Sequence, residues 1–272
     1  MGAASDHPWF DGLPERYVIG HRGAPGHRPE NTLQSFQHAV ALGADVLELD
    51  VHLTADGQLV VIHDLVVGRV SNSAGPVISF TLDDLRQLDV GYWYTPDGGR
   101  TYPWRGKGLT VPTLAEVFEM FPDRKLVIEL KTRTFAVVRA LAKELNKKDR
   151  RGQVLVGSFR HPLLEEFRRL APAYATGASM RETRRFVIRT LRGRPIEQPL
   201  LYEAIIAPPR RRGIIPVLTR GVVENALQIG LHVQAWTVNK PRTMHRLYGY
   251  GVHAMTTDYP DRARAVLDEL RS

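Results

Sequence analysis

The sequence predicts an α/β fold, a (β/α)8 barrel with a small insertion after an early strand. A chain of 272 residues is long for one ordinary domain but suits a single barrel of this kind, which needs about 250 residues. Short β-rich runs alternate with amphipathic helical runs along the chain, as expected for a parallel sheet that closes on itself. With 43% hydrophobic residues, the chain can also build a large core.

The first half of the chain supplies the early strands. They are predicted at residues 17–21, 45–51, 58–64 and 125–131. The second and third of these strands are joined by TADG, whose Asp56-Gly57 pair is a strong turn signal. Helices are predicted over 32–42 and from Thr113 onward.

The second half continues the alternation and ends in a helix. Its strands are predicted at residues 153–159, 173–179, 204–208, 233–238 and 254–258. Its other helices are predicted over 135–145, 162–170, 220–229 and 241–248. Polar or aromatic residues recur at the strand ends: His21, Glu48, Asp50, His63, Glu129, Lys131, Ser158, Trp236 and Asp258. Because the carboxyl ends of barrel strands form the active-site face, we expect these residues to gather there.

Residues 65–112 interrupt the alternation. This segment contains GYWYTPDGGRTYPWRGKG, which is rich in glycine, proline and aromatic residues, and a short helix is predicted over 82–88. It follows a strand end and should therefore emerge on the active-site face, so we interpret it as an inserted cap or lid. We expect its aromatic residues to shape the pocket: Tyr92, Trp93, Tyr94 and Trp104.

Composition excludes several kinds of site and partner. The chain has no cysteine, which excludes disulfides, thiolate metal sites and cysteine nucleophiles. The N-terminal segment lacks the apolar run of a secretory signal, and no stretch approaches the ~20 apolar residues of a membrane span. We therefore expect a soluble, cytoplasmic protein.

The net charge of +8 is concentrated in an Arg-rich segment, 181–220. Such a segment is typical of a solvated face, a nucleic-acid surface or an anionic membrane surface.

Three carboxylates indicate a metal site. Glu48 and Asp50 in ELD are two residues apart, so both point to one face of a strand, and Glu129 ends a later strand. Without cysteine, three oxygen ligands favour a hard divalent cation, Mg²⁺ or Ca²⁺. Paired carboxylates also serve glycoside hydrolysis, but two on a single strand suit a metal better.

Two histidines and two cationic side chains accompany the carboxylates. His21 and His63 end different predicted strands, and such a pair can act as general base and general acid in succession. Arg22 and Lys131 can both hold phosphate. A divalent cation, two histidines and two positively charged side chains are the groups needed for nucleophilic displacement at phosphorus.

Five segments stand out in order along the chain: HRGAPGHRPENTLQSF, GADVLELDVHLTADGQLVVIHD, LVIELK, AWTVN and TTDYP. Together they resemble the glycerophosphodiester phosphodiesterases, the TIM-barrel phosphodiesterases related to phosphatidylinositol phospholipase C. The resemblance implies one TIM-barrel domain over 17–272, with 65–112 inserted within it. It also implies hydrolysis of glycerophosphodiesters to sn-glycerol 3-phosphate and an alcohol, through attack of the glycerol 2-hydroxyl on phosphorus and opening of the cyclic phosphate by water.

The resemblance assigns a role to each matched residue. His21 and His63 match the catalytic histidines, and Glu48, Asp50 and Glu129 match the metal ligands. Arg22 and Lys131 match phosphate-binding residues, and Trp236 matches an aromatic residue that lines the substrate site. The implied partner is a small-molecule glycerophosphodiester rather than nucleic acid.

Two alternatives stay open. The Arg-rich segment 181–220 favours an anionic lipid headgroup, which leaves a lysophospholipase D-type activity on lysophospholipids and transient contact with an anionic membrane surface. Arg160, His253 and Ala254 depart from the family pattern and bear on substrate preference. A non-catalytic barrel that binds anionic surfaces is the other alternative, although such a module has no need of the histidine and carboxylate set.

Overall fold

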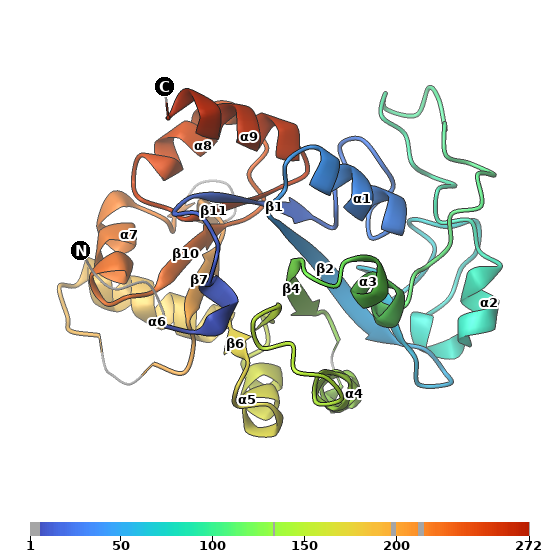
Figure 1. Ribbon diagram of the computed structural model, residues 1–272, viewed down its shortest axis with the longest axis horizontal. Helices are drawn as coiled ribbons and strands as arrows, with labels where there is room; N and C mark the ends of the chain where they lie inside the picture. The colour runs from blue at the N-terminus through green and yellow to red at the C-terminus, as the bar shows by residue number, and fades with distance from the viewer. Residues whose placement is uncertain (1–5, 133, 197–199, 212–214, 272) are drawn as a thin grey trace.

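Parallel strands form a nearly closed barrel (Figure 1). The computed structural model describes residues 6–132, 134–196, 200–211 and 215–271. The barrel strands are β1 (Tyr17–His21), β2 (Val46–Leu53), β4 (Lys125–Leu130), β5 (Val154–Gly157), β6 (Ala175–Thr176), β7 (Ala204–Ala207), β10 (His232–Ala235) and β11 (Ala254–Thr257). They pair in the order β6-β5-β4-β2-β1-β11-β10-β7, and a parallel bridge between Gly177 and Ala204 links the two ends of this order. The predicted (β/α)8 fold is confirmed.

Helices pack on the outer surface of the barrel. They are α1 (Leu33–Ala41), α3 (Leu114–Met120), α4 (Phe135–Leu145), α5 (His161–Leu170), α6 (Met180–Leu191), α7 (Arg220–Gln228), α8 (Pro241–Tyr248) and α9 (Pro260–Glu269). Each buries one face against the strands; Phe36 of α1 and Phe167 of α5, for example, share a core with Leu49 of β2. In the described part of the chain, no helix is long and apolar enough to cross a membrane. The cytoplasmic location stays a prediction.

Trp9 and Phe10 fill the end of the barrel where the strands begin. They lie in a short 3-10 helix, η1 (Pro8–Phe10), and both are buried. The Trp9 indole Nε1 donates to the carbonyl oxygens of Leu126 and Gln153 at 3.2 and 3.1 Å. Side chains occupy this end, so the site is left to the opposite end, where the strands finish.

β3 (Leu59–Val61) pairs antiparallel with β2 and lies outside the order of barrel strands. The prediction that His63 ends a barrel strand is therefore wrong. A short Asp-Gly turn reverses the chain directly, whereas a parallel neighbour needs a crossover of a dozen or more residues. The returning chain nevertheless reaches the same end of the barrel, because the Ile62 amide donates to the Asp50 carbonyl at 3.1 Å.

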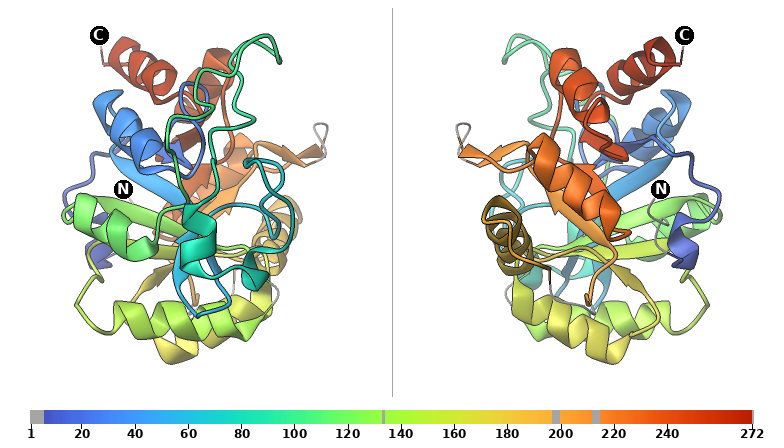
Figure 2. Two further views of the ribbon diagram at one scale, coloured as in Figure 1. Left: turned by 90° about the vertical axis from the view of Figure 1, so that its right-hand side faces the viewer. Right: turned by 90° about the vertical axis from the view of Figure 1, so that its left-hand side faces the viewer.

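Residues 65–112 lie across one end of the barrel (Figure 2, left). They contain η2 (Val77–Ser79) and α2 (Leu82–Arg86), and α2 matches the helix predicted over 82–88 to within two residues. A separate buried cluster ties the segment to Val60 and Ile62 and includes Val67, Val77, Leu85, Val90, Leu109 and Val111. The insertion is therefore an ordered unit with its own small core, and its role as a cap stays a prediction.

Two elements in the Arg-rich segment have no counterpart among the predicted elements. One is α6, which begins with a capping box between Ser179 and Glu182. The other is a short antiparallel pair, β8 (Arg210–Arg211) and β9 (Ile215–Pro216), which projects from the barrel (Figure 2). The Ser-x-x-Glu pattern was a readable signal for the start of α6. Arg212, which contributed to the predicted basic surface, lies outside the described residues.

Acid is expected to destabilise the fold through two stacked histidines near η1. The ring of His232 lies 3.7 Å from that of Phe10 and 4.2 Å from that of His253, between centroids. Burial lowers the pKa of His232 to about 3 and that of His253 to about 4. The unfolded chain takes up these protons below a pH of about 6.5, but the folded chain does not. The free energy of unfolding should therefore fall as the pH drops from about 6.5 toward about 4.

In the wild-type protein, His232 should account for about 2 kcal/mol of the decrease in the free energy of unfolding between neutral pH and about pH 5. The variant His232→Phe should not show this part of the decrease. Phenylalanine preserves the stacking, and among the described residues neither ring nitrogen of His232 has a hydrogen-bond partner to lose. Denaturant titrations of both proteins at the two pH values measure the free energies. Equal acid losses in the two proteins would contradict this assignment.

Candidate active site

The site is built on the turn that follows β1. Arg22 and Gly23 have φ values of 51° and 89°, both in the left-handed region. This conformation is costly for arginine, and such strain is typical of functional positions. At Gly23 a Cβ would collide with the Ser35 side chain, so the position requires glycine. The turn directs the Arg22 amide N–H to Glu48 Oε2, at 2.9 Å.

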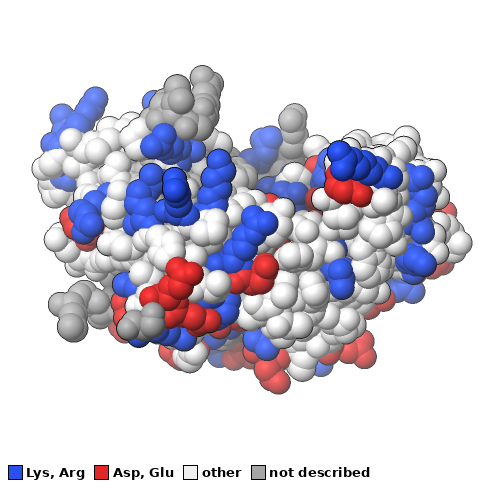
Figure 3. Space-filling model, turned by 90° about the horizontal axis from the view of Figure 1, so that it is seen from above, with Lys and Arg blue, Asp and Glu red and all other residues white. Residues whose placement is uncertain are grey.

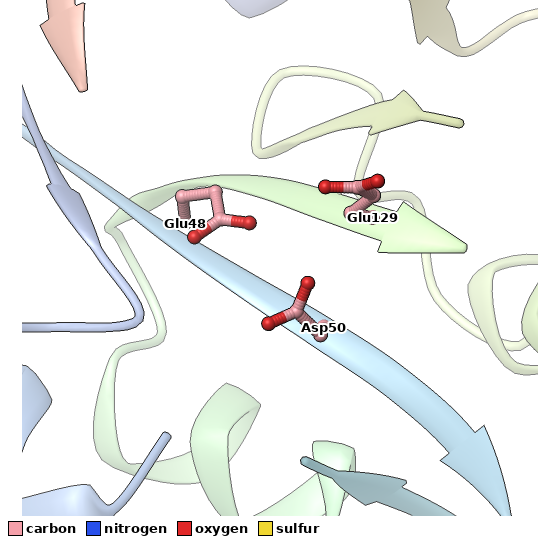
Figure 4. Close-up of side chains that lie close together, drawn as sticks. All are labelled: Glu48, Asp50 and Glu129. Atoms are coloured by element: carbon pink, nitrogen blue, oxygen red, sulfur yellow. The ribbon is translucent and has the colours of Figure 1, made fainter. Parts of the chain in front are cut away.

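Glu48, Asp50 and Glu129 converge beside this turn (Figure 4). The spacing of two places Glu48 and Asp50 on the same face of β2. The parallel register then sets Asp50 directly beside Glu129 of β4. One oxygen from each carboxylate lies within 4.8 Å of the others. The structure thus brings the three predicted metal ligands together from two neighbouring strands.

The carboxylate cluster fits a divalent cation. Burial and the charge of Asp50 raise the pKa of Glu48 to about 7. Burial also raises the pKa of Glu129, which the charge of Lys131 only partly offsets. Among the described residues, Asp50 Oδ1 and Glu129 Oε1 are buried without a hydrogen-bond partner. Crowded carboxylate oxygens of this kind are ligands for Mg²⁺ and Ca²⁺ alike.

Arg22 and Lys131 border the carboxylates. Arg22 Nε lies 3.2 Å from Asp50 Oδ2, and its Nη1 donates to Glu30 at 3.0 Å. Lys131 follows β4, and its Nζ lies 2.9 Å from Glu129 Oε2 and 3.7 Å from Asp50 Oδ1. A phosphate beside the carboxylates would meet a guanidinium fork and an ammonium group, both of which bind phosphate oxygens.

A chain of hydrogen bonds holds His21. Its Nδ1 lies 2.6 Å from Asp258 Oδ1, and Asn239 Nδ2 donates to Asp258 Oδ2 at 2.5 Å. Burial acts to lower the pKa of His21, but the Asp258 bond and the charge of Glu48 outweigh it and raise the pKa. Because Nδ1 is bonded to Asp258, Nε2 is the ring nitrogen left for proton transfer.

A second chain of charged groups holds His63. Its Nδ1 lies 2.5 Å from Asp64 Oδ1, and Asp64 Oδ2 accepts a hydrogen bond from Arg69 Nε. Arg69 also donates to Glu30 at 2.7 and 2.8 Å, and Glu30 in turn binds Arg22. Burial lowers the pKa of His63. Arg69 belongs to the insertion, so that segment is tied to both His63 and Arg22.

A cavity of about 610 Å³ opens beside these groups. One end is lined by the polar residues His21, Arg22, Glu48, Glu129 and Lys131. Trp236 and Phe159 also line the cavity, and their ring centroids are 5.0 Å apart. His63 and the fully buried Asp50 lie outside the lining.

The aromatic residues of the insertion do not line this cavity. Tyr92, Trp93, Tyr94 and Trp104 were expected to shape the pocket, but the cavity wall is formed by other segments. Arg105 instead stacks on Tyr92 at 4.1 Å and on Trp93 at 5.4 Å from the ring centroids. These contacts are local to the insertion, where the aromatic rings are held by the charge of a neighbouring arginine.

Several residues of the site were missed from the sequence. Asn31 donates to Asp50 Oδ2 at 3.0 Å, and Glu30, Asp64, Asn239 and Arg69 position the groups described above. Four of these five lie inside quoted motifs: Glu30 and Asn31 in HRPEN, Asp64 in IHD and Asn239 in WTVN. Arg69 lies in none of these motifs. Its role could not be read from the sequence, because only the folded structure places the insertion next to Glu30.

Comparison with known proteins identifies the family and agrees with this fold. The family model for the glycerophosphoryl diester phosphodiesterase family matches residues 21–262. A glycerophosphodiester phosphodiesterase from Caldanaerobacter subterraneus subsp. tengcongensis is 33% identical over 249 residues, covering 90% of this chain and 94% of that protein.

Two solved structures are similar in fold. A phosphodiesterase from Oleispira antarctica, solved with the product sn-glycerol-3-phosphate, has a TM-score of 0.75 and 26% identity, covering 94% of this chain and 97% of that one. A glycerophosphoryl diester phosphodiesterase domain from Mycobacterium tuberculosis has a TM-score of 0.83 at 22% identity, covering 94% of this chain and all of that one. The second likeness bears on the fold alone.

A TIM barrel with this acidic cluster and this family match defines a hydrolase of phosphoric diesters. The chain belongs to the glycerophosphoryl diester phosphodiesterase family. It is a glycerophosphodiester phosphodiesterase, and the alternative of a non-catalytic barrel is not supported.

Proposed function

We propose that this enzyme hydrolyses glycerophosphodiesters to sn-glycerol 3-phosphate and an alcohol with a divalent cation and two catalytic histidines. One observation supports the proposal: Glu48, Glu129, two cationic side chains and His21 line one end of a single cavity, and the buried Asp50 carboxylate lies beside them. Glu48, Asp50 and Glu129 would hold Mg²⁺ or Ca²⁺, which supplies Lewis-acid stabilisation of charge on phosphate oxygens.

The protein side chains divide the remaining work. Arg22 and Lys131 bind the other phosphate oxygens and orient the diester. One histidine takes the proton of the glycerol 2-hydroxyl as that oxygen bonds to phosphorus, and the other gives a proton to the departing alcohol. Water then opens the cyclic phosphate with the proton transfers reversed. The hydrogen bonds from His21 to Asp258 and from His63 to Asp64 keep each imidazole ring in place for these proton transfers.

The insertion and Trp236 complete the proposed site. We assign the catalytic domain to residues 17–272, with 65–112 as a cap whose Arg69 braces Asp64 and Glu30. Trp236 faces the cavity and contacts the organic part of the substrate. The alternative lysophospholipase D-type activity breaks the same kind of bond and needs, in addition, room for an acyl chain.

Purified protein with glycerophosphocholine and either Mg²⁺ or Ca²⁺ tests the function. We expect choline and sn-glycerol 3-phosphate in equal amounts, because cleavage falls between phosphorus and the choline oxygen. Glycerophosphoethanolamine should behave in the same way, and sn-glycerol 3-phosphate itself should not be hydrolysed. Release of glycerol with phosphocholine, or no release with either ion, would contradict the proposal.

A further inference from the structure

Helix α6 presents two polar side chains to the cavity. Thr183 and Arg184 lie in the first half of the helix, and both line the cavity that also contains the polar end described above. Among the described lining residues, Arg184 is the only charged one outside that polar end. The proposed hydrolysis gives this arginine no role, because Arg22 and Lys131 bind the scissile phosphate.

The strand register explains why the start of α6 lies near the carboxylates. Glu129 of β4 pairs with Gly157 of β5. The residue before Gly157 pairs with Thr176, the last residue of β6. Helix α6 begins at Met180, shortly after this strand ends. Its first turns therefore lie at the end of the barrel where the strands finish, two strands away from Glu129.

A second cavity adjoins the first at α6. Its volume is about 590 Å³, and the two cavities have four lining residues in common: Phe159, Met180, Arg184 and Ile188. The other described residues of its lining are His161, Arg181, Arg185 and Arg189, so this lining contains no carboxylate. Arg184 therefore stands where the substrate cavity meets a basic region.

Two polar groups at this junction have no partner among the described residues. Arg184 is exposed and forms no ion pair there, and the neighbouring acid, Glu182, is taken up by Arg168 at 2.8 Å. Thr183 is only 9% exposed, and its Oγ1 has no hydrogen-bond partner although the residue lines the cavity. A buried hydroxyl of this kind costs free energy until a bound group supplies the hydrogen bond.

Net charge alone does not single out this position. On the face seen in Figure 3, Lys and Arg side chains are spread out, and Asp and Glu side chains lie among them. Arg184 differs from an ordinary surface arginine because it lines the cavity beside a buried hydroxyl without a partner. A guanidinium fork and a hydroxyl donor are groups that bind a phosphate.

We propose that the enzyme prefers glycerophosphodiesters whose alcohol carries a phosphate group of its own, and that Arg184 and Thr183 bind this second phosphate. The inference deepens the proposed function and rests on it, because the scissile phosphodiester still lies beside Arg22 and Lys131. In the overall reaction, water adds across the bond between phosphorus and the alcohol oxygen. The hydroxyl of the water goes to phosphorus, its proton goes to the departing alcohol, and the alcohol keeps its phosphate.

A matched pair of substrates measures this preference. Glycerophosphoinositol and glycerophosphoinositol 4-phosphate differ only in the second phosphate, and both release sn-glycerol 3-phosphate. We expect kcat/KM to be about tenfold higher for the phosphorylated substrate at low ionic strength, because it gains charge-assisted hydrogen bonds. The ratio should fall as salt is added, since Arg184 is exposed and its charge is screened.

Three variants assign the preference to its residues. Arg184→Ala should bring the ratio of kcat/KM values to about twofold or less, because the guanidinium is lost. Thr183→Val should lower the ratio by roughly threefold, and valine gives up no hydrogen bond to the described residues. Arg192→Ala is the control, because Arg192 is an exposed arginine at the end of the same helix and lines neither cavity. It removes the same charge and should keep the wild-type ratio. Thermal unfolding of each variant confirms the fold.

The outcomes separate this inference from the proposed function. Hydrolysis of both inositol substrates with equal kcat/KM would overturn the inference alone, as would hydrolysis of glycerophosphocholine but of neither inositol substrate. An equal fall of the ratio in Arg184→Ala and Arg192→Ala would also overturn it, because the preference would then follow net charge. Hydrolysis of none of the three substrates would overturn the proposed function and this inference with it.

Discussion

His21→Ala is expected to lower kcat by about 10²–10⁴-fold while leaving the fold and metal binding nearly intact. The side chain lines the cavity beside Glu48, and its Nδ1 is bonded to Asp258. Alanine removes the Nε2 that exchanges a proton with the substrate. The backbone turn persists because Gly23 and the Arg22 amide, rather than the His21 side chain, shape it.

His63→Ala should have an effect of the same size. The measurement is steady-state kcat with glycerophosphocholine, together with thermal unfolding to confirm the fold. His245→Ala on α8 is the matched control, because His245 is 39% exposed by its side chain and pairs with Glu269 away from the cavity. A variant of His21 or His63 that keeps more than about a tenth of wild-type activity would remove that histidine from the mechanism.

Chelation of divalent cations should abolish activity, and re-addition of Mg²⁺ or Ca²⁺ should restore it. The three carboxylates lie within 4.8 Å of one another, and a cation would balance their charge. Without such a cation the reacting phosphate would lose its strongest source of charge stabilisation. Full activity in excess chelator, with no metal in elemental analysis, would contradict the metal site.

Glu48→Gln separates the metal site from the fold. The amide oxygen of glutamine can still accept the Arg22 N–H, so the turn should survive. One charge fewer weakens metal affinity but also relieves repulsion in the metal-free site. We therefore expect lower metal affinity by calorimetry and an unchanged or higher Tm in chelator. Glu119→Gln on the exposed face of α3 is the control and should change neither quantity.

Asp50→Asn and Glu129→Gln should weaken metal affinity too. Asp50 also meets Arg22, Lys131 and Asn31, so its replacement has additional structural consequences. A metal affinity equal to wild type in all three carboxylate variants would place the cation elsewhere.

The alternation of elements was predictable from the sequence because each strand and helix has its own hydrophobic period. The strands predicted at 45–51 and 125–131 correspond to β2 and β4, most of whose residues are buried. α6 was missed because its sequence is dominated by arginine and its apolar residues are divided between a core, where Phe186 is buried, and the cavity, which Ile188 and Leu191 line. A pattern read as a solvated surface was therefore one wall of the pocket.

Local spacing determined the alignment of Glu48 with Asp50, because side chains two residues apart on a strand share a face. Only the tertiary structure decided their neighbours. Strand register set Glu129 beside Asp50, and an antiparallel return delivered His63 from a strand outside the barrel. Arg69 of the insertion donates hydrogen bonds to Glu30, which is 39 residues away in the sequence. The aromatic residues of the insertion lie outside the cavity lining. The physical reason is that spacing along one element follows from backbone geometry, whereas contacts between elements depend on packing that no single segment encodes.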